Sequence, residues 1–442
     1  MRSNSRASKI RRSWGGRLLA TAGTVGLLLA LAPPGVAVAT GTTWVVKPGQ
    51  SIQAAADKAS SGDTIKIEAG KYYEAVCIEG KGLTIRGAGR DSTIILPPPT
   101  ATANDCWVPG TPEGGTVENV CALKFLNPDR PVAVTDLQTN GHPEDGIVVW
   151  GAKGFTVKHT KGVGHGVYGI LATAGSTNIV ITDNIEQGAT GPIGPVGTAG
   201  ISVGDSANAK ALIANNRSEG LHLGIFARES RTGTISNNTV RGNCIGILVF
   251  DDSATRSPVR PPNVIGGNWA VLANRSVVNN GYCIASRDGS QHVSGMGMAI
   301  VNADKVLVSA NTITDDHPVI PPGQDPVNFF PAGMAVLTFP MPPGQPGVDP
   351  GPAENFKVVG NIFKNNQPFD IQLCRAGIGR YLHAEPVRHQ RSGDDLDEVI
   401  PIAGEAVRPR SLASAGSRRG LTAGAHRPIG RISSIRPPAP HR

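Results

Sequence analysis

Three acidic side chains follow three successive copies of one short apolar phrase. Five positions after the glycine that opens each copy, the sequence places Asp205, Glu229 and Asp251. If the copies stack as neighbouring strands, aligned residues lie about 4.8 Å apart. Carboxylates that close repel one another, which raises the pKa of one group or recruits a cation. The spacing therefore predicts either a general acid for glycoside cleavage or a Ca²⁺ ion held against an anionic sugar.

The neighbours of these acids suit a sugar ligand. Arg228 and Asp252 flank the acids along the chain, and His222 precedes the middle copy of the phrase. Trp150 and Phe250 occupy the outward-facing fourth position after the glycine, where a flat ring can support a sugar. The predicted catalytic set is Asp205, Glu229, Asp251 and Arg228. The predicted substrate-binding set is Trp150, His222, Phe250 and Asp252.

Two reaction types fit the acidic ladder, and so does a purely structural role. In a hydrolase, one carboxylate donates a proton to the glycosidic oxygen while another activates water. In a lyase, the acids hold Ca²⁺ against a uronate and Arg228 is the nearest base, although arginine normally stays protonated. The structural alternative is that aspartate at a turn caps its own backbone.

The elements that carry these residues are short strands in a repeat. The glycine-led phrase begins at Gly146, Gly169, Gly200, Gly224, Gly246, Gly297 and Gly333. A second phrase alternates apolar and polar residues and ends at Asn184, Asn216, Asn238, Asn311 and Asn361. Period-two alternation predicts strands, and glycine or asparagine predicts a corner after each strand. A unit this short buries its apolar face only against copies of itself, so the sequence predicts a solenoid.

The composition of the repeat selects the kind of solenoid. Isoleucine and valine dominate the strands, helical periodicity is nearly absent, and the leucine-rich consensus is missing. A parallel β-helix therefore fits better than a leucine-rich repeat. We expect the corner asparagines to stack and to hydrogen-bond from coil to coil. The stretch 51–60 places Ile52, Ala55, Ala56 and Ala59 on one helical face, which predicts a short helix capping the N-terminal end.

A family resemblance supports this fold. The stretch "VKPGQSIQAAADKASSGDTIKIEAGKYYE" resembles the first coil of the pectin lyase-like superfamily of right-handed parallel β-helices. Within it, Gly70-x-Tyr72-x-Glu74 is similar to a phrase of pectin methylesterases. The resemblance covers 42–373 and implies an all-β, right-handed parallel β-helix. It does not imply one activity, because the fold hosts lyases, hydrolases, esterases, epimerases and non-catalytic modules.

Two departures argue against particular activities within that superfamily. The later glutamine, aspartate and arginine motifs of pectin methylesterases are missing from the sequence. Asp315-Asp316-His317-Pro318 has the composition of the Asp-Pro-His-Asp motif of alginate epimerases, but a different order. The resemblance therefore does not favour methylesterase or epimerase activity.

The ends of the chain differ from the repeat. Residues 1–39 combine a basic start, an apolar run and Ala37-Val38-Ala39, which predicts a secretory signal peptide. The apolar run is too short for a good membrane span. Residues 375–442 are rich in arginine, proline and serine, and we expect a disordered tail. The formal charge is +8 overall, and these two ends carry +6 each, so the predicted domain 40–374 has −4. Nucleic-acid binding therefore has little support.

Six cysteines in an exported chain predict disulfides. The expected bridges are Cys106–Cys121 and Cys244–Cys283, although the sequence leaves other pairings and buried free thiols open. The sequence thus predicts a secreted, monomeric β-helix that recognises an extracellular polysaccharide or cell-wall glycan. It cleaves this polymer as a lyase or glycoside hydrolase, or it is a non-catalytic module that binds glycans or the cell surface. A structural accessory solenoid is the third class.

Overall fold

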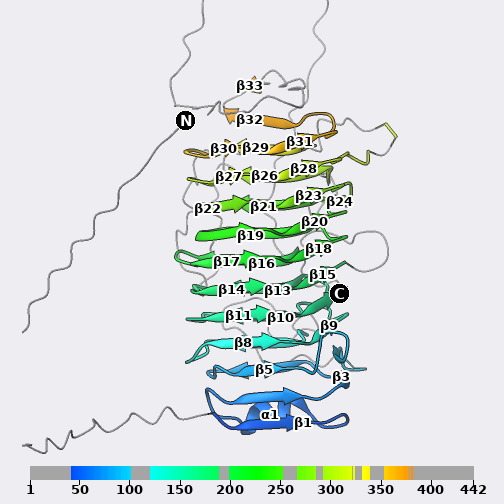
Figure 1. Ribbon diagram of the computed structural model, residues 1–442, viewed down its shortest axis with the longest axis vertical. Coiled ribbons are helices and arrows are strands. Elements are labelled where there is room, and N and C mark those ends of the chain that lie inside the picture. The colour runs from blue at the N-terminus through cyan, green and yellow to red at the C-terminus, as the bar shows by residue number, and fades with distance from the viewer. Residues whose placement is uncertain are drawn as a thin grey trace, which may run out of the picture. The chain divides into compact units, whose positions relative to one another are not determined.

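The computed structural model describes residues 41–100, 120–188, 199–251, 266–284, 292–320, 322–323, 331–338, 353–377 and 380–381. The predicted signal peptide and nearly all of the predicted tail lie outside these residues. Within them, short parallel strands stack coil upon coil (Figure 1). The predicted all-β parallel solenoid is therefore confirmed.

Each full coil has one strand on each of three faces, called A, B and C. Face A contains β1 (Thr43–Val46), β2 (Thr64–Ile67), β5 (Thr84–Arg86), β8 (Val132–Thr135), β11 (Phe155–Lys158), β14 (Ile179–Thr182), β17 (Ala211–Ala214), β22 (Gly267–Leu272), β27 (Leu307–Ser309) and β30 (Lys357–Val359). Face B contains β3 (Gly70–Tyr73), β6 (Thr93–Leu96), β9 (Gln138–Asn140), β12 (Lys161–Val163), β15 (Ile185–Gln187), β18 (Arg217–Glu219), β20 (Thr239–Arg241), β23 (Arg275–Val277), β28 (Thr312–Thr314) and β31 (Ile362–Lys364).

Face C contains β4 (Val76–Glu79), β7 (Leu123–Leu126), β10 (Ile147–Trp150), β13 (Tyr168–Thr173), β16 (Ala199–Ser206), β21 (Ile245–Phe250), β26 (Met296–Val301), β29 (Ala332–Thr338) and β32 (Ile371–Gly377). One long strand, β19 (Leu223–Ser236), pairs first on face C and then on face A. Two antiparallel pairings are β24 (Tyr282–Ile284) with β25 (His292–Ser294), and β32 with β33 (Arg380–Tyr381). Strand structure thus continues past the domain boundary at 374 that the sequence predicts.

The core lies inside the coils and follows from period-two alternation. In β14, Ile179 and Ile181 are buried, while Val180 and Thr182 face outward. Burying such a side chain contributes roughly 1.5–3 kcal/mol relative to leaving it exposed. Face C is different, because most of its strands after β4 are buried on both sides: Phe226 and Leu248 point away from the core and are still covered. This explains why face C strands read as continuous apolar runs.

The repeated glycine of the face C phrase leaves room for a polar side chain. A Cβ atom at any of these glycines would lie within 3.0 Å of a polar atom from a nearby coil. The polar side chains concerned are His165, Glu186, Ser218, Asn243, Ser276, Asp316 and Asn366. The glycine repeat is therefore a packing requirement of the coil.

The corner between faces A and B carries a ladder of buried asparagines. It consists of Asn184, Asn216, Asn238, Asn274, Asn311 and Asn361. From Asn184 to Asn311, each Nδ2 donates to the Oδ1 of the asparagine in the next coil, at 2.9–3.0 Å, whereas Asn361 Nδ2 donates to the Val308 carbonyl. The same Oδ1 atoms also accept backbone N–H groups. The predicted stacking of corner amides is confirmed, and Asn274 is an additional member.

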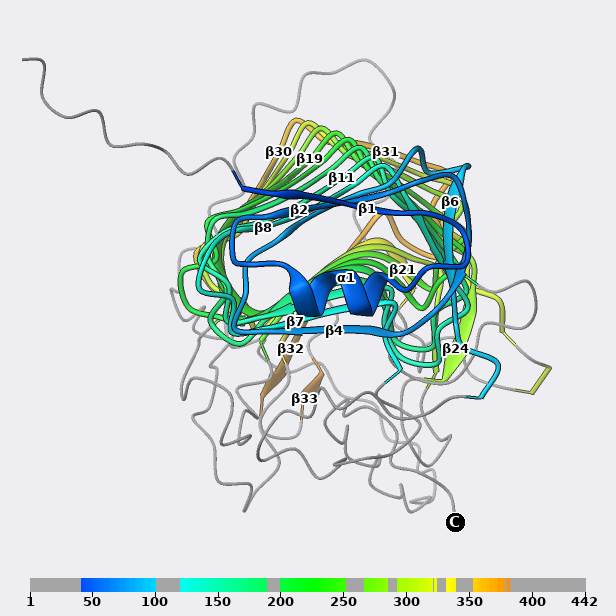
Figure 2. The same cartoon turned by 90° about the horizontal axis from the view of Figure 1, so that it is seen from below.

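The predicted N-terminal helix is α1 (Ile52–Lys58), which buries Ile52 and Ala56. Figure 2 shows α1 lying across the end of the apolar interior, between face A and β4. Glu74 accepts hydrogen bonds from the backbone N–H groups of Ile52 and Gln53, at 2.9 and 3.0 Å. A carboxylate at a helix N-terminus satisfies donors that lack a partner within the helix. The conspicuous Glu74 therefore has a structural role.

One predicted disulfide is confirmed and the other is wrong. Cys244 and Cys283 are bonded, with Cα atoms 6.1 Å apart. Cys121 is a buried free cysteine, so it forms no bridge with Cys106, which itself lies outside the described residues. Cys77 is disulfide-bonded.

Among the described residues, none of the helices has the length and apolar character needed to cross a membrane.

Candidate functional site

The strand register aligns the three predicted acids. Gly204 pairs with Arg228 and Ser206 with Ser230, which puts Asp205 beside Glu229. Arg228 in turn pairs with Phe250, so Asp251 follows in the next coil. The alignment that the repeat predicts is therefore present in the backbone.

The side chains of these acids are buried at a corner of the coil. Their exposed fractions are 4% for Asp205 and 0% for both Glu229 and Asp251. Asp205 accepts a hydrogen bond from the Thr173 hydroxyl at 2.9 Å, and Asp251 accepts one from the Gly266 N–H at 2.7 Å. Asp205 and Glu229 adopt left-handed backbone angles, as glycine, alanine and asparagine do in aligned coils. These contacts agree with the alternative in which the acids stabilise the turn. The catalytic roles of the three acids stay predictions.

Glu229 is the least satisfied of the three acids. Within the described part of the chain, neither of its carboxylate oxygens has a hydrogen-bond donor. Arg228 Nη2 lies 3.6 Å from Glu229 Oε1, and the Arg228 side chain is 11% exposed. The pair is thus a nearly buried ion pair on face C.

The acidic ladder does not form a metal site of three converging ligands. In the described ranges, one group brings three His, Cys or acidic ligand atoms within 4.8 Å of one another, and it is Cys121, Glu144 and Asp145. Because Asp205, Glu229 and Asp251 form no such group, the geometry does not support a Ca²⁺ ion held jointly by all three.

The Cys121 group is better described as a protonated cluster. Cys121 Sγ lies 3.2 Å from Glu144 Oε2 and 3.9 Å from Asp145 Oδ2. Burial, reinforced by Glu144, raises the pKa of both Cys121 and Asp145 well above their ordinary values. The nearby Lys124 acts in the opposite direction on both groups. A thiol that holds its proton this firmly is a poor metal ligand, since metals bind the thiolate.

The predicted substrate-binding side chains lie at separate places. Trp150 is half-buried against Leu126, and the Phe250 ring packs 6.2 Å from the Phe226 ring. His222 is 2% exposed, and burial lowers its pKa to about 4. Asp252 lies outside the described residues. Their roles in substrate binding stay predictions.

A groove that sequence reasoning missed runs along the corner between faces A and B, beside the asparagine ladder. Its volume is about 840 Å³. Its charged lining residues are Arg90, Asp183, Arg217, Arg241 and Arg275, with His159 near one end. Four arginines against one aspartate leave three positive charges. We call this feature the arginine groove.

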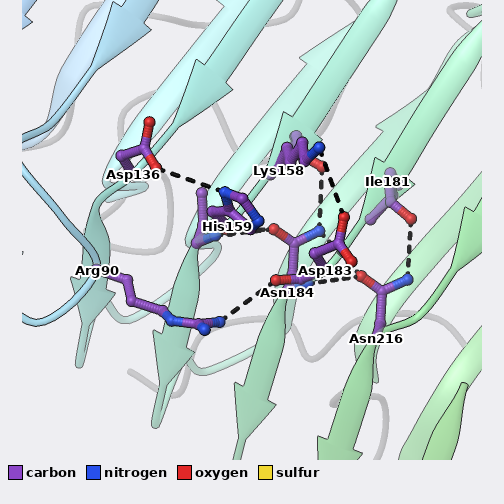
Figure 3. Close-up of polar contacts among 10 residues, drawn as sticks. Arg90, Asp136, Lys158, His159, Ile181, Asp183, Asn184 and Asn216 are labelled. Carbon is purple, nitrogen blue, oxygen red and sulfur yellow. Dashed lines mark hydrogen bonds and ion pairs between the residues drawn. The ribbon is translucent and has the colours of Figure 1, made fainter.

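Figure 3 shows the end of the arginine groove nearest the N-terminus. Arg90 Nη1 donates to the carbonyl oxygen of Asp183 at 3.4 Å, while Lys158 Nζ lies 3.8 Å from the Asp183 carboxylate. His159 Nδ1 lies 3.6 Å from Asp136 Oδ1. Arg90 therefore brings its positive charge to the groove without an acidic partner at this contact.

The other end of the groove is built by face B strands. Arg217 donates from Nε and Nη2 to Glu219 Oε2, at 2.9 and 2.6 Å. Arg241 and Arg275 follow in β20 and β23. In the sequence, Arg217 and Arg275 each follow a corner asparagine directly, and this Asn-Arg-Ser pattern was the available signal.

Comparisons with known proteins agree with the fold. The model of the right-handed beta helix region matches residues 145–313 and confirms the predicted handedness. No curated protein matches the chain in sequence. Among solved structures, an alginate lyase from Paenibacillus sp. str. FPU-7 is 15% identical with a TM-score of 0.41, over 76% of this chain and 98% of that one.

Two further solved structures are similar at the same level. The A-module of the Azotobacter vinelandii mannuronan C-5 epimerase AlgE4 is 13% identical with a TM-score of 0.33, over 74% of this chain and 93% of that one. The catalytic domain of a GH87 alpha-1,3-glucanase is 14% identical with a TM-score of 0.36, over 78% of this chain and 70% of that one. Likeness this distant concerns the fold and carries nothing about activity.

Proposed function

We propose that this protein binds an anionic extracellular polysaccharide along the arginine groove. The observation that carries the proposal is the concentration of Arg90, Arg217, Arg241 and Arg275 in one groove. The predicted domain 40–374 has a formal charge of −4, so this positive surface is not a consequence of a generally basic domain. Guanidinium groups match carboxylate and sulfate oxygens through paired hydrogen bonds.

The shape of the groove suits an extended polymer. Its lining reaches from the corner before β12 to β23, which is four strand-to-strand steps. At about 4.8 Å for each step, the groove spans roughly 19 Å. No phenylalanine, tyrosine or tryptophan is among its described lining residues. These lining residues therefore provide no large aromatic ring on which a sugar or a nucleic-acid base could stack, and the groove holds its ligand through charges.

Binding to acidic and neutral polymers tests this proposal. We expect the full chain to bind oligogalacturonate or hyaluronan, to lose affinity as salt rises, and to ignore dextran. Arg241→Gln and Arg275→Gln together should weaken binding about tenfold or more, because each removes a charge-assisted contact. Lys66→Gln, which removes an exposed charge on face A, is the matched control. Equal binding to dextran, or to short DNA, would contradict the proposal.

We include the extracellular location of the protein in the same proposal. The Cys244–Cys283 disulfide is of a kind that persists outside the reducing cytosol. Together with the predicted signal peptide, it supports a secreted protein that meets its polymer outside the cell. Mass spectrometry of culture medium, with the mature N-terminus sequenced, tests secretion directly.

Cleavage of a polysaccharide is the second candidate, and it concerns a different place, the corner between faces C and A, where the register aligns Asp205, Glu229 and Asp251. In this hypothesis Arg228 and the three acids form the catalytic centre. Reducing-end and ultraviolet-absorbance assays on a polysaccharide panel measure hydrolysis and elimination. Turnover that disappears in Asp251→Asn supports cleavage, whereas retention without turnover supports the non-catalytic module.

A further inference from the structure

A second groove runs along face A, at the end of its strands that lies away from the arginine groove. Its volume is about 520 Å³. Its charged lining residues are Lys210 and Lys305, and none of its lining residues is acidic. Thr234, Ala270 and Leu307 contribute uncharged side chains to the lining. We call this feature the lysine groove.

The polar side chains of the lysine groove form a column in register, with one residue from each of four coils. The pairing of β17 with β19 aligns Lys210 with Thr232, and the pairing of β19 with β22 aligns Thr232 with Asn268. The isolated bridge one residue earlier aligns Asn268 with Lys305. At about 4.8 Å for each step, the backbone positions of the two lysines are roughly 14 Å apart along the stack of coils.

The backbone of this column is unusual for the side chains it carries. Lys210, Thr232 and Lys305 have left-handed φ angles of 45°, 70° and 55°. Asparagine, which tolerates such angles better, fills the aligned positions at Asn178 and Asn355. A left-handed angle is unfavourable for most residues, and most of all for a β-branched one. Residues that hold strained angles cluster at functional sites, which favours a role for these three side chains.

The two lysines are accessible to an acidic ligand. Lys210 forms no ion pair with the residues that the structure describes. Lys305 Nζ lies 3.6 Å from Asp304 Oδ2, but these side chains are 61% and 25% exposed. An exposed ion pair of this kind contributes little, so a ligand carboxylate can compete with Asp304. Between the lysines, Thr232 and Asn268 offer a hydroxyl and an amide, which are joined by a hydrogen bond of 3.2 Å.

The lysine groove and the arginine groove lie at opposite ends of the same face A strands. Lys210 directly precedes β17, and Asn215, which lines the arginine groove, directly follows it. At about 3.3 Å for each residue, these two positions are roughly 17 Å apart. Leu212 and Ala214 lie between them in β17 and carry no charge. Two extended ligands can therefore occupy the two grooves side by side.

We propose that the lysine groove is a second binding site for the same acidic polysaccharide, so that one protein holds two polymer chains. The inference rests on the proposed function. A sugar residue in an extended chain is about as long as the strand spacing, so a chain parallel to the stack of coils places about one sugar on each coil. Its acids then meet Lys210 and Lys305, and its hydroxyls meet Thr232 and Asn268. Two sites on one protein cross-link long polymers.

Calorimetric titration of the full chain with short oligogalacturonate tests the inference. We expect two binding events, the weaker one at the lysine groove, because lysine contacts an acid as a point charge. The double variant Lys210→Asn, Lys305→Asn should weaken that event about tenfold and leave the stronger one unchanged. Because asparagine suits the left-handed backbone, thermal melting of this variant should not be lowered. Light scattering with long polygalacturonate should show cross-linking by the unchanged protein and not by the variant.

The controls separate the two grooves from each other and from general charge effects. Lys66→Gln with Lys71→Gln removes two exposed charges outside both grooves and should change neither event. Arg241→Gln with Arg275→Gln should weaken the stronger event alone. A single event in the unchanged protein, or unchanged affinities in the lysine variant, refutes the second site while binding in the arginine groove stands. If oligogalacturonate does not bind at all, the proposed function fails together with the inference.

Discussion

Asp316 occupies a place in a second amide ladder where an asparagine would fit better. Its Oδ1 accepts hydrogen bonds from the backbone N–H and the Nδ2 of Asn279, at 2.8 and 3.1 Å. Asn366 Oδ1 accepts from the Asp316 N–H at 3.2 Å. The side chain is buried, and Asp316 Oδ2 has no partner among the described residues. Asn243, Asn279 and Asn366 fill the aligned positions with amides.

This position predicts that Asp316→Asn stabilises the protein at neutral and alkaline pH. Burial raises the pKa of Asp316 from 3.8 to about 7, and the neighbouring Asp315 adds to the increase. Because the folded pKa is above the unfolded value, protonated Asp316 contributes to the free energy of unfolding. This contribution is complete below about pH 4 and is lost as the pH rises to about 7. Over that range the loss is about 4 kcal/mol, at 1.36 kcal/mol for each unit of pKa difference. An uncharged amide avoids it.

Thermal unfolding of Asp316→Asn and of the unchanged protein at pH 4.5 and pH 8 provides the assay. We expect the variant to melt several degrees higher at pH 8 and within about a degree at pH 4.5. Asp91→Asn, which alters an exposed acid, is the control and should change neither value. A variant that melts at or below the unchanged protein at pH 8 would refute the assignment of Asp316 as a buried acid in an amide position.

Two other buried polar positions give predictions. Asn238→Ala removes the Oδ1 that accepts from the N–H and Nδ2 of Asn216, and the Nδ2 that donates to the Ile213 carbonyl and to Asn274 Oδ1. We therefore expect about 3–5 kcal/mol lower stability in urea unfolding, against little change for Ser236→Ala. Burial lowers the pKa of His222 to about 4, below its ordinary 6.5, so its contribution is present above pH 6.5 and is lost as pH falls. Urea unfolding at the two pH values should therefore show that His222→Gln reduces the stability loss between pH 7 and pH 5 by about 2 kcal/mol.

The fold was predictable because a solenoid is specified by local, repeated rules. The interval between the copies that start at Gly200, Gly224 and Gly246 sets the coil length, and that length fixes which residues align. The register of Asp205 with Glu229 and Asp251 followed from this interval alone. The corner asparagines were equally visible, because an amide is suited to bonding with its own copies above and below.

What each aligned residue touches was not predictable in the same way. The acids of the ladder align as expected, yet they are buried, because face C is covered on its outer side as well. Cys121 lies beside Glu144 and Asp145 and forms no disulfide, since pairing depends on distances across coils.

The sequence by itself determined the coil, its length and the residues that stack within it. The tertiary structure decided which of those stacks faces solvent. The arginine groove illustrates the difference: Arg217 and Arg275 share one repeat column through Thr239, but Arg241 lies two residues further along its strand, in another column. They meet because neighbouring coils lie about 4.8 Å apart and long side chains reach between them. Proximity across coils depends on side-chain reach and corner shape, which a one-dimensional repeat does not encode.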